Sequence, residues 1–378
     1  MKLMHLSDLH LGKRLNEFSL LEDQAYILHQ LVHIAQDEHP DAVLIAGDLY
    51  DKPVPPAEAV SLLDDFLARL SSLHIPVMII SGNHDSPERL SFGARLISAS
   101  GVYLAPVYGG TVEPITLTDD HGPVDVFLLP FIKPSHVRRY FPDEEIATYT
   151  DAVACAIRHM NIKSDRRNVL VTHQFVTGAA CCESEELSVG GTDQVDASVF
   201  DDFDYVALGH IHGPQNIKSE RIRYCGTPLK YSFSEAKHHK SVTMVELAVK
   251  GSLSIRCIPL TPLRDMLELR GTYNELTARS YYANLDTSSY VHITLTDEED
   301  IPDAAAKLRV IYPNLMKLDY DNRRTRTQAD FAQAAEVQSR SPQELFGEFY
   351  EKQNGQPMSA EQADYIDQLV RQLWEGHS

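Results

Sequence analysis

Side chains able to bind metal ions stand in five short clusters, and each cluster follows an apolar run. The donors are carboxylates, imidazoles and one amide, without a thiolate. This mixture suits manganese, iron or zinc better than magnesium or calcium, which prefer oxygen ligands alone. Such an ion lowers the pKa of a bound water, so that hydroxide becomes available as a nucleophile for hydrolysis. The clusters are Asp8 and His10; Asp48 and Asp51; Asn83, His84 and Asp85; His173; and His210 and His212.

Strands and helices in alternation would position these side chains. Two stretches with helical spacing, residues 21–39 and 56–73, connect the first three apolar runs. This alternation is typical of an α/β or a layered α+β domain. Because open sheets bind ligands beyond the carboxyl ends of their strands, we expect the five clusters to converge on one site. The predicted strands are Lys2–Leu6, Ala42–Ala46, Val77–Ile80, Val124–Leu129, Val169–Val171 and Tyr205–Leu208.

Each cluster alone has a simpler explanation. A histidine at the end of a strand is more often structural than a ligand, and Asn83 to Asp85 could form a hydrogen-bonded turn. The clusters nevertheless occur in order, each directly after an apolar run, which makes a shared metal centre the better hypothesis.

The ordered clusters resemble the motifs of the calcineurin-like metallophosphoesterase superfamily over residues 1–250. Four further segments are similar to the SbcD family, the nuclease subunits of bacterial SbcCD complexes. This resemblance implies a β-sandwich flanked by helices, two divalent ions per chain that are usually Mn²⁺, a homodimer, and an SbcC-type coiled-coil ATPase as partner. The segments are Gly47–Asp51, Pro130–Pro134, Val189–Gly191 and Gly226–Ser232.

The resemblance also implies roles for individual residues. Asp8, His10, Asp48 and His212 would hold one ion, and Asp48, Asn83, His173 and His210 would hold the other, with Asp48 as the bridge. His84 would assist departure of the leaving oxygen. Asp85 would either orient His84 or cap a turn, and both interpretations stay open.

The function implied is that of a DNA nuclease, with 3′–5′ exonuclease activity on double strands and endonuclease activity on single strands and hairpins. One alternative is a phosphatase or small-molecule phosphodiesterase, which would share every metal ligand but lack a capping domain and a partner-binding tail. Another is a scaffold that has lost activity, and the intact ligand set with His84 argues against it.

The composition restricts how the protein could meet DNA. Acidic residues number 54 against 34 basic ones, and the formal charge of −20 opposes general attraction to phosphate polymers. We therefore expect local contacts from Lys13, Arg14 and Arg89, which lie in loops after site strands.

Five irregularly spaced cysteines do not predict a disulfide framework, and Cys181 and Cys182 are expected to have no role in catalysis or metal binding. No segment predicts a membrane span or signal peptide, so we expect a cytoplasmic protein.

Residues after the catalytic region predict three further parts. The expected division is a nuclease domain over residues 1–260, a small α+β capping domain over 261–320, a linker over 321–340 and a helix pair over 341–378. The helix pair begins with two capping-box patterns and carries apolar stripes. We expect these stripes to bind the ATPase. They include Leu345, Phe346, Phe349, Leu369, Leu373 and Trp374.

Overall fold

The computed structural model describes residues 1–185, 193–323, 350, 358–359, 362–363 and 365–366. The six side chains expected to bind the ATPase and most of the expected linker lie outside these residues. Contacts divide the chain into two units. The first comprises Met1–Leu269, Leu276–Ile293 and Asp303–Leu318, and the second comprises Arg270–Glu275, Thr294–Pro302 and Asp319–Ser378.

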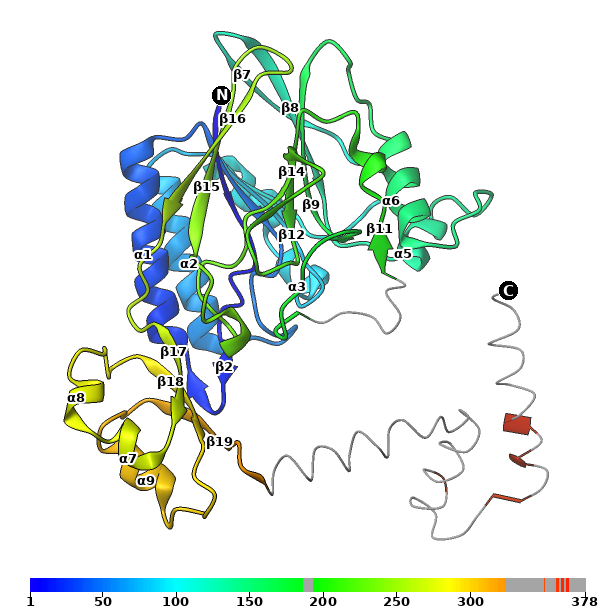
Figure 1. The fold of residues 1–378 in the computed structure, drawn as a ribbon. Helices are drawn as coiled ribbons and strands as arrows, with labels where there is room; N and C mark the ends of the chain where they lie inside the picture. The colour runs from blue at the N-terminus through cyan, green and yellow to red at the C-terminus, as the bar shows by residue number, and fades with distance from the viewer. Residues whose placement is uncertain (186–192, 324–349, 351–357, 360–361, 364, 367–378) are drawn as a thin grey trace. The chain divides into compact units, whose positions relative to one another are not determined.

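Two six-stranded sheets form the body of the first unit (Figure 1). The first sheet has four parallel strands in the order β1, β4, β5 and β6, and β15 and β16 extend it in antiparallel fashion beside β1. Its strands are β16 (Leu253–Pro259), β15 (Ser241–Leu247), β1 (Lys2–Leu6), β4 (Ala42–Ala46), β5 (Val77–Ile80) and β6 (Val102–Ala105).

The second sheet is also mainly parallel, with antiparallel strands at both edges. In spatial order its strands are β13 (Gln215–Ile217), β14 (Ser219–Tyr224), β12 (Tyr205–Gly209), β9 (Arg167–His173), β8 (Gly122–Leu129) and β7 (Ile115–Asp119). The six strands predicted from the sequence match β1, β4, β5, β8, β9 and β12.

The sheets pack face to face, and helices cover their outer faces. Leu44 of β4 belongs to the apolar layer between the sheets together with Val169 of β9. Its neighbour Ile45 packs instead in the layer of helices α1 (Leu21–Glu38) and α2 (Ala57–Ser72). Helices α5 (Pro134–Arg138) and α6 (Tyr149–Arg158) cover the second sheet. Because the central strands are buried on both faces of their sheets, their sequences are continuous apolar runs. The expected β-sandwich flanked by helices is confirmed.

Short elements complete the described part of the chain. A three-stranded sheet contains β17 (Met266–Gly271), β18 (Tyr290–Leu295) and β19 (Leu315–Tyr320). The remaining elements are β2 (Arg14–Leu15), β3 (Phe18–Ser19), α3 (Pro87–Leu90), α4 (Ala94–Ile97), β10 (Phe175–Val176), β11 (Gln194–Val195), α7 (Tyr273–Leu276), α8 (Arg279–Tyr282) and α9 (Ala304–Arg309). Among the described residues, no helix has both the length and the apolar character needed to cross a membrane.

Candidate metal centre

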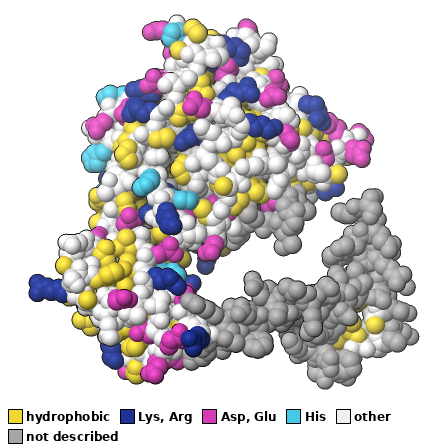
Figure 2. All heavy atoms as spheres, in the orientation of Figure 1, with side chains coloured by type: hydrophobic (Ala, Val, Ile, Leu, Met, Phe, Trp, Pro, Cys, Tyr) yellow, Lys and Arg dark blue, Asp and Glu magenta, His cyan; other side chains and the backbone are white. Residues whose placement is uncertain are grey.

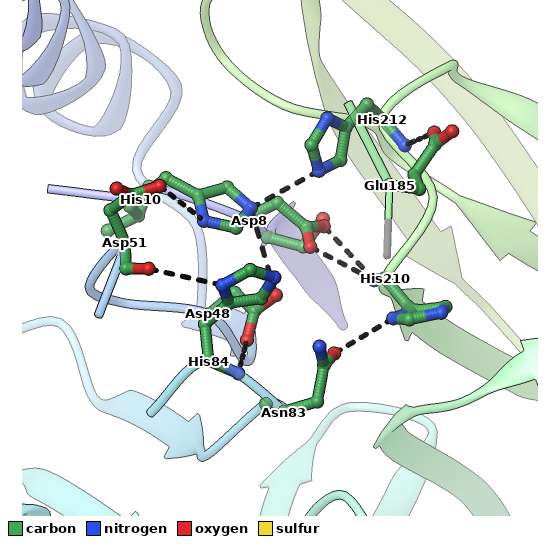
Figure 3. Close-up of polar contacts among 12 residues, drawn as sticks. Asp8, His10, Asp48, Asp51, Asn83, His84, Glu185, His210 and His212 are labelled. Atoms are coloured by element: carbon green, nitrogen blue, oxygen red, sulfur yellow. Dashed lines mark hydrogen bonds and ion pairs between the residues drawn. The ribbon is translucent and has the colours of Figure 1, made fainter. Parts of the chain in front are cut away.

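The predicted ligands meet where the carboxyl ends of strands from both sheets come together. β1, β4 and β5 of the first sheet end just before Asp8, Asp48 and Asn83. In the second sheet, β9 ends at His173 and β12 ends just before His210. The convergence expected at the edge of one open sheet is thus built between two sheets, whose loops face one another (Figure 3).

Left-handed backbone turns aim several of these side chains into the site. Asp8, His10 and Asp48 have φ angles of 53°, 44° and 49°, and His210 has a φ of 103°. Such values are uncommon for residues other than glycine, and they cluster at functional sites where the surrounding structure enforces them. Here hydrogen bonds between loops enforce them, since the Asp8 N–H donates to the Gly47 carbonyl and the His10 N–H to the Asp48 carbonyl.

Two glycines allow close approach at the site, Gly209 between the two sheets and Gly82 between the loops after β4 and β5. A Cβ on Gly209 would lie 1.9 Å from the Ala46 carbonyl oxygen, and a Cβ on Gly82 would lie 2.0 Å from Asp48 Oδ1. The Ala46 oxygen belongs to the backbone, and a Cβ on Gly82 would also lie 2.6 Å from the Asp48 backbone nitrogen. These positions therefore require glycine for steric reasons.

One group of donors converges on the amide oxygen of Asn83. This oxygen lies 3.0 Å from His173 Nε2 and 2.9 Å from His210 Nδ1. On its other ring nitrogen, His173 donates from Nδ1 to the Ala46 carbonyl, at 2.7 Å. That bond keeps a proton on Nδ1 and makes Nε2 the nitrogen that would bind a metal ion.

A second group of donors lies beside the first. His10 Nε2 and His212 Nε2 are 3.2 Å apart, and Asp8 belongs to the same cluster. Asp48 lies between the groups, because its Oδ2 is 3.7 Å from His10 Nε2 and 3.3 Å from His173 Nε2. All seven predicted ligands are thus brought together, and the central position expected for Asp48 agrees with these distances.

The electrostatics of the cluster favour a cation. Burial would raise the pKa of Asp48, but the facing imidazoles of His173 and His10 outweigh burial and hold it well below its usual range. Burial likewise opposes protonation of His173, yet Asp48 raises its pKa to about 9. Without a metal ion, a proton on His173 therefore supplies positive charge to the centre. Burial holds the pKa of His10 well below its usual value and lowers that of His210 to about 3, so both present neutral nitrogens.

These observations fit divalent metal ions. In one group, the Nε2 atoms of His10 and His212 face each other at 3.2 Å. In the other group, the imidazole nitrogens of His173 and His210 face the amide oxygen of Asn83. In each group the donor atoms point toward a common position, as ligands of one ion do. The carboxylates provide negative charge, and no cysteine belongs to either group. Oxygen and nitrogen donors without sulfur are typical of hydrolytic centres with manganese, iron or zinc.

Comparison with known proteins identifies the family. The calcineurin-like phosphoesterase family matches residues 1–214. A protein named as the D subunit of nuclease SbcCD, from Staphylococcus epidermidis, is 35% identical over 377 residues, covering 98% of both chains. Its namesake from Staphylococcus saprophyticus is 33% identical over 384 residues, covering 99% of both chains. The chain belongs to the SbcD family of calcineurin-like phosphoesterases. The resemblance seen in the sequence is confirmed, and membership makes the chain a metal-dependent phosphoesterase.

Two further matches concern the C-terminal region and the fold. A family described as the type 5 capsule protein repressor C-terminal domain, or SbcD_C, matches residues 262–354. Among solved structures, a dimetal phosphatase from Danio rerio is 14% identical and covers 70% of this chain and 98% of its own, with a TM-score of 0.43. This structural likeness is too low to support an argument about function.

In this SbcD family member, His84 lies at the centre and Asp85 does not orient it. The carboxylate of Asp85 accepts hydrogen bonds from the backbone N–H groups of Leu49, Tyr50 and Gly82, at 2.9–3.1 Å. His84 instead directs Nδ1 to the Asp51 carbonyl, 3.1 Å away. Of the two interpretations left open, the structure favours the cap for Asp85. It ties the β4 and β5 loops together, and the backbone of Asp51 orients His84.

The residues expected to contact DNA differ in their surroundings. The Lys13 ammonium lies at the metal centre, 2.7 Å from Asp51 Oδ1. Arg14 and Arg89 are exposed, and the Arg14 guanidinium bonds to the Glu17 carbonyl. On the face drawn in Figure 2, lysines and arginines are scattered among acidic side chains rather than gathered in one patch. Of these three residues, Lys13 is the one linked to a predicted ligand, because Asp51 Oδ1 also lies 3.9 Å from His10 Nδ1.

Sequence reasoning missed a polar network behind His212. His212 Nδ1 lies 2.8 Å from Ser184 Oγ, whose hydroxyl donates to Glu235 Oε1 at 2.6 Å. Burial would raise the pKa of Glu235, but His212 and Lys240 outweigh it and hold the carboxyl ionised. The Gly226–Ser232 segment, noted as a family motif, was the available signal, since Glu235 follows it directly.

The adjacent cysteines show no sign of reactivity. Burial, with Glu185 and other acidic neighbours, raises the pKa of the Cys182 thiol to about 12 and raises that of Cys181 as well. Thiols with raised pKa values are poor nucleophiles and poor metal ligands. Their raised pKa values agree with the interpretation of both residues as bystanders.

Proposed function

We propose that this protein is the nuclease component of a complex with a coiled-coil ATPase, and that it cleaves DNA with the aid of divalent metal ions. The observation that carries the proposal is the similarity to the D subunits of nuclease SbcCD over nearly the whole of both chains. A small phosphatase would share the metal ligands but would not require the C-terminal region. The family match to residues 262–354 therefore favours the nuclease.

We propose two ions per chain, with Mn²⁺ as the ion used. Asp8, His10, Asp48 and His212 would hold one, and Asp48, Asn83, His173 and His210 the other. The facing nitrogens and the central position of Asp48 support this division. When bound, the ions supply a hydroxide nucleophile and neutralise charge on the phosphate.

The chain's own residues would position the substrate and assist the leaving group. His84 is held by the Asp51 carbonyl at Nδ1, which leaves Nε2 to carry a proton to the departing oxygen. Its backbone N–H donates to Asp48 Oδ1 at 2.9 Å, so the same residue also steadies the central carboxylate. The Lys13 ammonium, beside Asp51, would contact a phosphate oxygen.

We propose DNA ends and hairpins as substrates, cleaved by 3′–5′ exonuclease and by endonuclease activity, with residues 261–320 guiding DNA. The test uses the purified full chain with double-stranded, single-stranded and hairpin DNA, and with a small phosphodiester. We expect DNA cleavage with Mn²⁺ and almost none with EDTA. Hydrolysis of the small phosphodiester without cleavage of any DNA would instead favour the phosphodiesterase.

We propose that residues 341–378 bind the ATPase. A chain ending at Arg340 should keep Mn²⁺-dependent DNA cleavage but fail to co-purify with the ATPase and lose stimulation by ATP. Co-purification with unchanged affinity would contradict this assignment.

We propose a homodimer, for which α3 and α4 offer an apolar surface. Phe92 and Leu96 are 91% and 80% exposed, which is unusual for large apolar side chains. Sedimentation should give a dimer at micromolar concentration and a monomer after Phe92→Glu with Leu96→Glu. A monomeric parent protein, with or without DNA, would refute the dimer.

We propose the cytoplasm as the compartment. All five cysteines are free thiols in the structure, as suits a reducing environment. Fractionation of cells that express the chain should place it with soluble cytoplasmic proteins, and recovery with membranes would contradict the proposal.

A further inference from the structure

The two groups of metal donors are held by different parts of the protein. His173 donates to the Ala46 carbonyl, which is backbone at the end of a central strand. Asn83 follows β5 directly and meets both imidazoles of its group. The backbone of β4 therefore anchors the His173 ring, and His173 in turn contacts Asn83.

His212 is instead held by the loop that follows β10. Its Nδ1 lies 2.8 Å from Ser184 Oγ, and its backbone N–H donates to Glu185 Oε1 at 2.7 Å. Because the Ser184 hydroxyl donates to Glu235, its oxygen is left to accept the proton of His212 Nδ1. That tautomer leaves the lone pair of Nε2 directed at His10 Nε2, 3.2 Å away.

Glu235 is a rigid anchor for this arrangement. Its side chain has no exposed surface, and Oε2 accepts from the Lys240 ammonium at 2.5 Å. Lys240 also donates to the His212 carbonyl at 2.9 Å. Glu235 Oε1 itself lies 3.5 Å from His212 Nδ1, whereas Ser184 Oγ lies 2.8 Å from the same nitrogen. Ser184 therefore makes the closer contact with the ring and links it to the fixed carboxylate.

His10, the other imidazole of this group, has no comparable support. Its Nδ1 is buried without a hydrogen-bond partner, and the nearest carboxylate oxygen, Asp51 Oδ1, is 3.9 Å away. Neither imidazole of the group is therefore anchored through its ring to the backbone of a sheet.

We propose that Ser184 is a positioning residue that couples the loop after β10 to one of the two ions. The Glu235, Ser184 and His212 chain orients His212, so the ion held by Asp8, His10, Asp48 and His212 depends on Ser184. The ion held by Asp48, Asn83, His173 and His210 does not. This inference rests on the two-ion assignment made under the proposed function.

The test measures Mn²⁺ binding to the full chain by electron paramagnetic resonance of free Mn²⁺. In Ser184→Ala, we expect one ion to bind ~10–100-fold more weakly and the other to keep its affinity, in line with losses from outer ligand partners. Ser184→Thr retains the hydroxyl and should restore both affinities. Ser71→Ala is a matched control, because it also removes a serine hydroxyl, one that donates to the Ser100 carbonyl instead of to Glu235.

Cleavage of DNA gives a second readout. In Ser184→Ala, raising the Mn²⁺ concentration should restore kcat, whereas a general loss of structure would not be reversed by metal. Thermal unfolding by circular dichroism checks that each variant folds. Equal weakening of both ions in Ser184→Ala, or no weakening of either, overturns the proposal.

The outcomes also separate this inference from the proposed function. A parent protein that binds a single ion refutes the two-ion assignment and this inference together. A parent that binds two ions but cleaves no DNA refutes the nuclease, and selective loss of one ion in Ser184→Ala would then still support the role of Ser184.

Discussion

Replacing Asp48 by asparagine should lower the pKa of His173 and remove metal binding together. Asp48 Oδ2 lies 3.3 Å from His173 Nε2, and the carboxylate is the main reason that the pKa of this buried imidazole is raised from 6.5 to about 9. Burial alone would lower that pKa. With the charge removed, the pKa of His173 should therefore fall to 6.5 or below.

The size of the effect follows from the same distance. A fall of about 2.5 pKa units corresponds to about 3 kcal/mol. The Coulomb energy of two unit charges 3.3 Å apart is about 5 kcal/mol at an effective dielectric constant near 20. The Coulomb energy exceeds the 3 kcal/mol because the carboxylate must also overcome burial, which lowers the pKa of His173; Asp8 and the Ala46 carbonyl add smaller contributions that raise it.

The assay is an NMR titration of metal-free protein labelled at histidine. The chain has 17 histidines, so the His173 signal is assigned by its loss in His173→Gln. Asp51→Asn is the matched control, because Asp51 lies near His10 and Lys13 rather than His173. Calorimetry with Mn²⁺ should show that Asp48→Asn has lost binding. A His173 pKa that stays near 9 in Asp48→Asn would refute the reasoning.

Three other changes test different parts of the centre. His84→Gln should bind metal normally but cleave DNA ~10²–10⁴-fold more slowly, because it loses proton transfer to the leaving oxygen; equal kcat would remove His84 from the mechanism. Gly209→Ala should lower the free energy of unfolding by about 3 kcal/mol or more, because the added Cβ would lie 1.9 Å from the Ala46 carbonyl oxygen. An unchanged thermal unfolding midpoint would contradict this, since it would mean that the two sheets can move apart at no cost. The affinity for Mn²⁺ should rise about tenfold per pH unit up to about pH 9 and then level off. The reason is that the ion must displace one proton from His173, whose pKa is about 9. Calorimetry that shows no proton release on Mn²⁺ binding below pH 9 would contradict this.

The sequence by itself determined the types of donor and the strands that carry them. Five apolar runs that end in aspartate, asparagine or histidine sufficed to predict that their side chains meet in one place. The family resemblance selected seven of them as ligands, and the structure brings all seven together. Apolar runs and periodicity also located six of the twelve strands in the two sheets, together with the helices α1 and α2. These features are local, since an apolar run specifies a buried strand wherever it occurs in a fold.

Only the tertiary structure decided which neighbours support these side chains. The sequence places Asp85 next to His84, yet Asp85 binds backbone N–H groups, two of them in the β4 loop, and His84 turns to the Asp51 carbonyl. Nothing near His212 in the sequence points to Ser184, which lies 28 residues earlier in the chain. A hydrogen bond requires two atoms within about 3 Å at the right angle, and only the packing of two sheets and their loops brings atoms so distant in sequence to that separation.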